Sequence, residues 1–213
     1  MRENPDYALE DTTAVKELVR ENPWCTFVTE VPGRGLVASH YPVLLDEGDE
    51  DIVLISHVGR PDEEKHQLGR HPMLAIVEGP NGYVSPSWYG FRPNVPTWNF
   101  AVVHLHGTAE ILSDAENLRA LDRLVEHFES PLPDPHLLNS TEENSEYAHR
   151  IIGGTVGFRM RVKRLEAKEK MNQDKSTETI RRIIAHLRAE GPYANSRLAD
   201  RMERVNGLAE EAR

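Results

Sequence analysis

The sequence predicts a mainly β protein, an antiparallel barrel with helices at its periphery. Apolar segments with strand character outnumber helical segments in the first two-thirds of the 213 residues. Most of them are joined by tight turns that contain Gly or Pro, which favours antiparallel strands over βαβ units. Neither G-x-G-x-x-G after a strand nor G-x-x-x-x-G-K-[ST] is present in the sequence. We therefore expect no Rossmann or P-loop nucleotide site.

The first elements form a helix followed by a hairpin. Residues 12–20 have the pattern of a short helix, and Asn22-Pro23 would end it. Residues 25–30 are strand-like, and the turn Pro32-Gly33-Arg34-Gly35 connects them to a second strand over 36–45.

Two apolar strands and a short helix are expected next. The acidic loop 46–51 precedes an apolar strand over 52–56. Residues 62–68 predict a helix that stops at Gly69. Another strand covers 73–77, and the sequence Gly79-Pro80-Asn81-Gly82 predicts a turn that closes it.

Two long strands with a helix between them are expected in the last part of the barrel segment, residues 102–165. Residues 102–111 predict a strand, and Ser113-Asp-Ala-Glu116 is a capping box that opens a helix with apolar residues at helical spacing. A Pro-rich connector over 131–135 leads to a final strand over 151–165.

The C-terminal segment is expected to be helical. A helix begins at Ser176 and stops at Gly191-Pro192, and a second covers 196–205. We therefore predict a barrel domain over 1–175 and a helical appendage over 176–213, packed on the barrel or on a dimer partner.

Composition limits the classes of function. The net charge of −10 disfavours general binding to phosphate backbones. No run of 18 apolar residues is present, so we expect no membrane span. The N-terminus has no apolar signal region, and the single Cys25 is typical of a reducing compartment. These features predict a cytoplasmic protein.

Five polar clusters lie at predicted strand ends, where binding residues usually sit. They are Ala38-Ser-His-Tyr-Pro42, Ser56-His-Val-Gly-Arg60, Gly79 through Tyr89, Pro96 through His106, and Lys168 through Lys175. The third and fourth clusters hold two of the three tryptophans, Trp88 and Trp98, among Ser, Thr, Asn and His. That mixture suits a wall for a flat, partly polar ligand, although a packed aromatic hairpin is an equal alternative on composition.

In this order the clusters resemble the PaiB family, described as FMN-binding negative transcriptional regulators. The Ser85-Pro-Ser-Trp-Tyr89 and Pro96-Thr-Trp-Asn99 pair is the most distinctive part of the resemblance. The resemblance implies a Greek-key split β-barrel related to pyridoxamine phosphate oxidases. It also implies a homodimer that binds FMN in clefts between its subunits, with an oxidoreductase-like or cofactor-sensing role.

The resemblance implies a set of cofactor-binding residues. They are Ser39, His40, Pro42, His57, Arg60, Ser85, Trp88, Tyr89, Thr97, Trp98, Asn99, Lys170, Gln173 and Lys175. Cationic and hydroxyl groups such as Arg60 and Lys170 would meet the phosphate. Trp98 and Asn99 would meet the isoalloxazine ring.

Acidic residues depart from the family pattern at two clusters. Asp62, Glu63 and Glu64 follow Arg60, and Asp174 stands where the family has Asn. Carboxylates beside a phosphate contact weaken anion binding unless they point away.

Haem b is the alternative cofactor, because some relatives of the family are haem-dependent piperazate synthases that close an N–N bond in N-hydroxyornithine. A haem would need one axial histidine and a flat apolar slot. The candidates for the axial ligand are His40, His57, His66, His104 and His106. For a metal ion alone, the pair His104 and His106 is insufficient, and we expect no metal site.

Regulation of transcription through DNA or a protein partner is the third alternative. The segment Asn195 to Met202 resembles the start of a recognition helix. Gly191-Pro192 interrupts the helix pair, and acidic residues oppose the arginines, so DNA binding is not expected.

Overall fold

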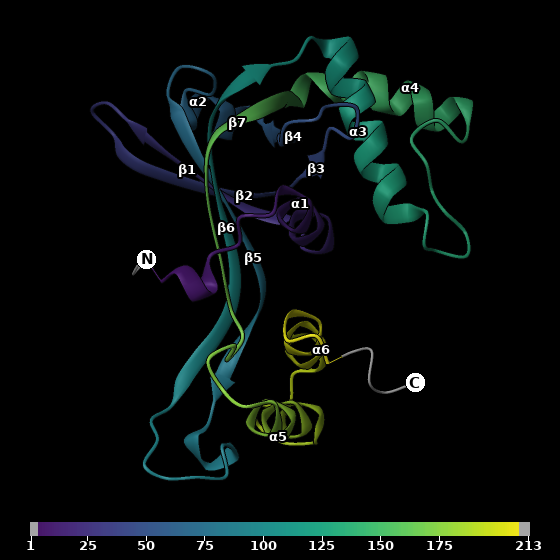
Figure 1. Ribbon diagram of the computed structural model, residues 1–213. Helices are drawn as coiled ribbons and strands as arrows, with labels where there is room; N and C mark the ends of the chain where they lie inside the picture. Colours follow the sequence, from purple (N-terminus) through teal and green to yellow (C-terminus); the bar gives the residue numbers. More distant parts are fainter. Residues whose placement is uncertain (1–3, 209–213) are drawn as a thin grey trace. The chain divides into compact units, whose positions relative to one another are not determined.

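The structure is a computed structural model that describes residues 4–208 (Figure 1). It forms two compact units, which are described separately. Unit 1 holds the described residues up to Val15, the segment Glu78–Val103 and the chain from Ala167 onward. Unit 2 holds Lys16–Val77 and His104–Glu166.

In the described part of the chain, seven strands form one sheet in the order β2-β1-β5-β6-β7-β4-β3. The strands are β1 (Trp24–Val31), β2 (Gly35–Pro42), β3 (Leu44–Leu45), β4 (Val53–Gly59), β5 (Pro72–Val84), β6 (Thr97–Ile111) and β7 (Thr155–Lys170). Strand β1 pairs with β2 and with β5, and β4 pairs with β3 and with β7, all antiparallel. The long strands β5, β6 and β7 each contribute residues to both units.

Six α-helices and three 3₁₀ turns accompany the sheet within residues 4–208. The helices are α1 (Thr12–Glu21), α2 (Arg60–His66), α3 (Asp114–Glu129), α4 (Glu142–Ile151), α5 (Thr177–Arg188) and α6 (Ser196–Val205). The 3₁₀ turns are η1 (Pro5–Tyr7), η2 (Pro86–Trp88) and η3 (Ile152–Gly154). Within residues 4–208, no helix has the length and apolar character needed to cross a membrane.

Unit 2 is built around the buried face of the sheet. Alternate residues of β1 are buried, as expected for a strand with one covered face. Phe27 of β1 meets Phe158 of β7 edge to face, with ring centroids 5.3 Å apart. Helix α3 approaches β7 at Gly157, where a Cβ atom would lie 2.6 Å from Asn117 Oδ1. Glycine is therefore required at that crossing.

Unit 1 contains the C-terminal helix pair. The buried face of α5 consists of Ile180, Ile183, Ile184 and Leu187 with Thr179, the spacing of an amphipathic helix. Leu198 and Met202 of α6 are also fully buried. A Cβ atom at Gly82 would lie 3.0 Å from Leu198 Cδ2, so glycine allows α6 to pack closely on β5.

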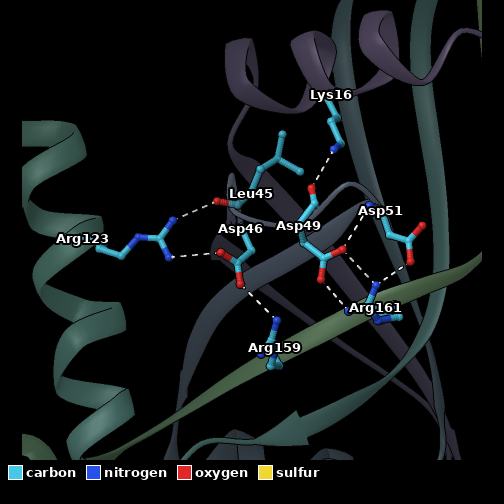
Figure 2. Close-up of polar contacts among 8 residues, drawn as sticks. All are labelled: Lys16, Leu45, Asp46, Asp49, Asp51, Arg123, Arg159 and Arg161. Atoms are coloured by element: carbon cyan, nitrogen blue, oxygen red, sulfur yellow. Dashed lines mark hydrogen bonds and ion pairs between the residues drawn. The ribbon is translucent and has the colours of Figure 1, made fainter.

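The acidic loop between β3 and β4 is held in unit 2 by basic side chains from three elements (Figure 2). Asp46 accepts from Arg159 of β7 at 3.1 Å, and Asp49 and Asp51 pair with Arg161. Lys16 of α1 donates to the backbone carbonyls of Asp49 and Glu50 at 3.2 and 2.8 Å. The loop is therefore fixed, although its sequence alone predicts a solvated surface turn.

Most predicted elements are present, and the differences have physical causes. Strand β5 continues to Val84 instead of turning at Gly79. Its pairing with β1 ends at Val77, so Pro80 does not interrupt that ladder. The predicted strand over 36–45 is divided into β2 and β3 at Val43, whose N–H donates to Pro23 O at 2.8 Å.

Helix α4 is present in the structure but was not predicted from the sequence. Strand β7 begins at Thr155 instead of residue 151. Ala148 is the buried residue of α4, so the helix has almost no apolar stripe for a periodicity analysis to find. The two units also divide the chain differently from the predicted boundary after residue 175, because α5 and α6 belong with Glu78–Val103. That boundary stays a prediction, and residues 1–3 and 209–213 of the predicted segments lie outside the described residues.

Candidate functional site

The end of β7 gathers several of the predicted site residues in unit 1. Lys170 donates through Nζ to the hydroxyl of Thr97, the first residue of β6. The same ammonium nitrogen lies 6.0 Å from the centre of the Tyr7 ring, which is within the range of a cation–π contact. The sequence predicts Thr97 and Lys170 as site residues, and the structure places them in contact.

Tyr7 is a site neighbour that sequence reasoning did not find. The N-terminal segment reaches β7 through a bridge between Ala8 and Lys168 and a hydrogen bond from Leu9 N to Ala167 O at 3.1 Å. Burial and the nearby carboxylate of Asp174 raise the pKa of Tyr7. The residues before Ala8 form no motif, so only the fold reveals this contact.

The loop after β7 contains the acidic departure Asp174. Its carboxylate accepts from Lys175 Nζ at 2.6 Å and from the Tyr7 hydroxyl. Burial raises the pKa of Asp174, but the hydrogen bond from Lys175 and its charge outweigh burial, and the net pKa is lowered. The negative charge of Asp174 is therefore paired with Lys175, and the same carboxylate is hydrogen-bonded to Tyr7.

Gln173 and Asn99 have structural contacts in this unit. Gln173 Oε1 accepts from Met171 N, and Gln173 Nε2 donates to Glu169 O, both at 2.6 Å. Asn99 is fully buried and donates to Asn172 Oδ1 at 2.6 Å. Asn172 adopts φ of +61°, a left-handed conformation that asparagine tolerates better than most residues. These contacts fix the loop that carries Lys175.

Trp88 and Trp98 belong to one aromatic cluster of unit 1. Trp98 meets Tyr83 at 6.4 Å, and Trp88 and Tyr83 both meet Tyr193 of the segment between α5 and α6, at 6.3 and 5.0 Å. Trp88 also stacks on His186 of α5 with centroids 5.2 Å apart. One face of Trp88 is therefore covered within the chain, whereas Trp98 is 53% exposed.

Trp98, Ser85 and Tyr89 are oriented by local hydrogen bonds. Trp98 Nε1 donates to Asn81 Oδ1 at 3.1 Å. Ser85 caps the turn η2, where its Oγ accepts from Ser87 N at 3.3 Å. Tyr89 is buried, and burial raises its pKa while a hydrogen bond with Asn172 lowers it, with a net increase. Packing within the chain thus accounts for Trp88 and Tyr89, and the ligand-wall alternative stays a prediction for the exposed Trp98.

The remaining predicted residues, Ser39, His40, Pro42, His57 and Arg60, lie in unit 2. Arg60 donates through Nε to Gly153 O at 3.0 Å and lies 3.8 Å from Glu63 Oε2. The Tyr41 hydroxyl donates to Asp62 Oδ2 at 2.7 Å and accepts from Gly59 N at 3.2 Å. Asp62 is therefore turned toward Tyr41, and its pKa is lowered first of all by that hydrogen bond.

Ser39 and Pro42 contribute to the internal structure of unit 2. Ser39 Oγ is 3.0 Å from His66 Nε2, and His66 Nδ1 is 3.0 Å from Thr29 Oγ1. The carbonyl of Pro42 accepts from Ser56 Oγ at 2.7 Å. Both nitrogens of the buried His66 are occupied, so this histidine is not available as an axial haem ligand in the described arrangement.

The other four candidates for an axial haem ligand differ in the hydrogen bonds of their ring nitrogens. His40 contacts Thr26 Oγ1 through Nδ1 at 2.9 Å, and His106 Nδ1 accepts from Arg164 at 3.0 Å. His57 packs against the Tyr41 ring, and its buried Nδ1 has no hydrogen-bond partner in the described part of the chain. Burial lowers the pKa of His57 and of His104. Across residues 4–208, no group of three or more His, Cys, Asp or Glu side chains is arranged to hold a metal ion.

Comparison with known proteins identifies the family. Residues 1–164 match the family model described as "Putative FMN-binding domain". The chain belongs to this FMN-binding family. It is also 29% identical to the "Protease synthase and sporulation protein PAI 2" of Bacillus subtilis over 187 residues, which cover 87% of this chain and 88% of the relative. The resemblance to the PaiB family is thus confirmed, and FMN is the cofactor indicated for the chain.

Two solved structures share the fold. The FAD and heme binding protein of Mycobacterium smegmatis aligns with a TM-score of 0.56 and 17% identity over 81% of this chain and 78% of that one. The flavocytochrome Anf3 of Azotobacter vinelandii aligns with a TM-score of 0.54 and 16% identity, over 76% and 69% of the two chains. The predicted class, a mainly antiparallel split β-barrel with peripheral helices, is confirmed.

Proposed function

We propose that the protein is an FMN-dependent, oxidoreductase-like protein, and that the end of β7 in unit 1 contributes to flavin binding. The contact of Lys170 with Thr97 and Tyr7 is the observation that carries this proposal. It combines a cation, a hydroxyl group and an aromatic ring within one unit. Those are the groups that a flavin mononucleotide requires.

The residues of this cluster have distinct proposed roles. Lys170 would supply positive charge for a phosphate group, and the Thr97 hydroxyl would add a donor. Lys175 would contribute less, because its ammonium group is already paired with Asp174 at 2.6 Å. Trp98 has an exposed ring whose Nε1 is already satisfied by Asn81, so its face is free to stack on a flat ring system. Bound FMN supplies one- and two-electron transfer, and the chain has to bind, orient and shield it.

The acidic residues that depart from the family pattern differ in how strongly they would disfavour a phosphate group. Asp174 is matched by Lys175 and Tyr7, so its charge is largely compensated. Glu63 lies within 3.8 Å of Arg60 and would compete with a phosphate for that guanidinium. We therefore favour Lys170 over Arg60 as the main cation for the phosphate.

We also propose that the protein functions as a cytoplasmic homodimer. The support for the dimer is the family resemblance, in which FMN lies in clefts between subunits. The support for the cytoplasm is the single cysteine, which is buried and free and typical of reducing compartments.

An anaerobic reduction assay tests the redox role. The protein is loaded with FMN and mixed with NADH or NADPH, and bleaching of the flavin absorption is followed. We expect faster reduction than for the same concentration of free FMN, because the bound flavin is oriented and its potential is set by the chain. Equal rates with protein-bound and free FMN would contradict an oxidoreductase role and leave cofactor sensing as the function.

Haem binding, as in a piperazate synthase-like enzyme, is the second candidate. Both structural relatives described above bind haem or are flavocytochromes by name. His57 Nδ1 and His106 Nε2 are buried nitrogen atoms without a hydrogen-bond partner in the described residues, and we favour His57 because Nδ1 of His106 is already bonded to Arg164. Reconstitution with haemin would give a Soret band that His57→Ala abolishes. An unchanged Soret band in the single His→Ala variants of His40, His57, His104 and His106 would exclude axial ligation by this set.

Regulation through DNA receives less support from the helix pair. Arg188 is engaged by Asp200 at 2.8 Å and by Glu203 at 2.7 Å, and Arg201 is buried against Glu169. Seven residues, 189–195, separate α5 from α6, a longer connection than the short turn of a helix-turn-helix. We propose that α5 and α6 support the aromatic cluster and not a DNA groove.

A further inference from the structure

We propose that unit 2 contains a second binding site, a cavity between α1, β3 and α3 that takes a free amino acid with an apolar side chain. The cavity has a volume of about 390 Å³, which lies within the usual range for small-molecule sites. Its lining consists of Val19, Arg20, Pro23, Val43, Leu44, Leu45, Glu47, Arg123, Glu126, His127 and Ser130. None of these residues belongs to the predicted flavin site.

The cavity contains a cation that can exchange its partner. Arg20 holds Glu47 in a bidentate pair, with distances of 2.7 and 2.8 Å to the two carboxylate oxygens. The two side chains are 42% and 55% exposed, so the pair adds little to stability. A ligand carboxylate could therefore replace Glu47 on the guanidinium group at small cost, with the same fork geometry.

The wall beside Arg20 is rigid. Arg123 of α3 donates to Leu45 O at 3.1 Å and lies 3.8 Å from Asp46 Oδ1 (Figure 2). Asp46 is in turn held by Arg159, and the rest of the loop is held by Lys16 and Arg161, as described above. The positions of Leu45 and of the loop segment that carries Glu47 are thus set before any ligand binds, which lowers the cost of binding.

Negative charge lies on the same lining. Glu126 is in the last turn of α3, and its carboxylate makes no hydrogen bond or ion pair in the described part of the chain. The C-terminal turns of α1 and α3 both border the cavity, and helix C-termini carry partial negative charge. An ammonium group is the natural complement of this side.

The remaining lining is apolar, so the ligand needs three features. Val19, Pro23, Val43, Leu44 and Leu45 would contact a hydrocarbon side chain. A purely anionic ligand would face Glu47 and Glu126, and a purely cationic one would face Arg20 and Arg123. A ligand with a carboxylate, an ammonium group and an apolar body satisfies all of them, and an aliphatic amino acid is the smallest such molecule.

Isothermal titration of the intact protein tests the ligand class with L-leucine, isocaproate and isoamylamine. Isocaproate lacks the amino group, and isoamylamine lacks the carboxylate. We expect each analogue to bind about fivefold more weakly than leucine, because each loses one ion pair with a solvent-exposed side chain. No heat with leucine at millimolar concentration, or equal affinity for either analogue, would overturn the proposal.

Two variants place the site. Arg20→Gln and Glu126→Gln should each weaken leucine binding by about fivefold, whereas Arg70→Gln, on the exposed surface outside the cavity, should not. Glu126 is exposed, so Glu126→Gln tests the site even if Arg20→Gln does not fold. Binding of leucine to both variants with unchanged affinity would refute the location. An FMN titration in the presence of leucine separates the two sites, because we expect no competition.

Discussion

At the residue scale, the proposed flavin site depends on the position of Lys170. Its Nζ donates to Thr97 and lies over the Tyr7 ring, so three segments distant in sequence meet at one ammonium group. The hydroxyl and the ring restrict the side chain without neutralising its charge. The Lys170 ammonium group is therefore positioned and still charged, as binding of an anion requires.

Replacing Lys170 by Gln should weaken FMN binding by about tenfold or more, because a charge-assisted hydrogen bond contributes about 1.5–3 kcal/mol. Quenching of flavin fluorescence on titration with protein measures the dissociation constant. Lys163→Gln is the matched control, since Lys163 is an exposed residue of the same strand. Equal affinity for FMN in the Lys170 and Lys163 variants would remove Lys170 from the site.

His66 predicts a pH dependence of stability. Burial lowers its pKa in the folded protein, whereas the unfolded chain titrates near the ordinary value of about 6.5. Below about pH 6.5 the unfolded state therefore binds more protons, and the free energy of unfolding decreases as the pH falls. Above that pH the histidine is neutral in both states and the contribution disappears.

Urea unfolding at about pH 7.5 and about pH 5.5 measures this effect, in a range where carboxylates remain ionised. We expect lower stability at the acidic pH and a smaller difference for His66→Asn. The pKa values of His57, His104 and His106 are also lowered by burial, so the variant should retain part of the slope. Identical stability of the natural protein at both pH values would contradict the assignment.

The sequence identified part of the candidate site, and the rest depends on tertiary contacts. Thr97 and Lys170 were both predicted, and they are in contact. Gln173 and Asn99 were also predicted to bind the cofactor, and that stays a prediction. Both side-chain polar groups of Gln173 and the Nδ2 of Asn99 contact the chain itself, whereas the buried Oδ1 of Asn99 has no hydrogen-bond partner in the described residues. A sequence motif shows which residue types could bind a ligand. Which partners their hydrogen bonds have depends on tertiary packing. Tyr7 could not be found because its neighbour Lys170 is remote in sequence.

At the element scale, a buried ion pair fixes α6 to the end of β7. Arg201 of α6 donates through Nε to Glu169, and their side chains are only 4% and 9% exposed. Removing one partner of such a pair leaves a buried charge. The attachment of α6 within unit 1 therefore depends on both residues.

Arg201→Met should reduce the free energy of unfolding by roughly 3–5 kcal/mol. The double variant Arg201→Met with Glu169→Leu should regain much of that loss, because no uncompensated charge remains. Urea denaturation of the two single variants and of the double variant provides the coupling energy. A double variant that loses the full sum of the single effects would show that the pair is not the cause.

Strand β5 and helix α4 show which elements a sequence predicts poorly. Gly79-Pro80-Asn81-Gly82 has the composition of a turn, but Gly82 is needed because α6 lies against it. Close packing by a helix that is remote in sequence leaves no pattern in the local sequence, so the sequence predicts a turn at this position. Helix α3 was found because a capping box precedes apolar residues at helical spacing.

At the scale of the whole molecule, strands β5, β6 and β7 contribute to both units. The family fold and the proposed cofactor site lead to the expectation of a homodimer. Light scattering coupled to size-exclusion chromatography should give a mass of about twice the 24.2 kDa of one chain. A mass of one chain at micromolar concentration would contradict the proposed dimer without touching the family assignment.

Titration of the purified protein with FMN tests flavin binding most directly. We expect quenching of flavin fluorescence that saturates at one FMN per chain, a shifted flavin absorption spectrum, and weaker binding by Lys170→Gln than by Lys163→Gln. Fluorescence that stays equal to that of free FMN throughout the titration, with no spectral shift, would contradict the assignment of this chain as a flavin-binding protein.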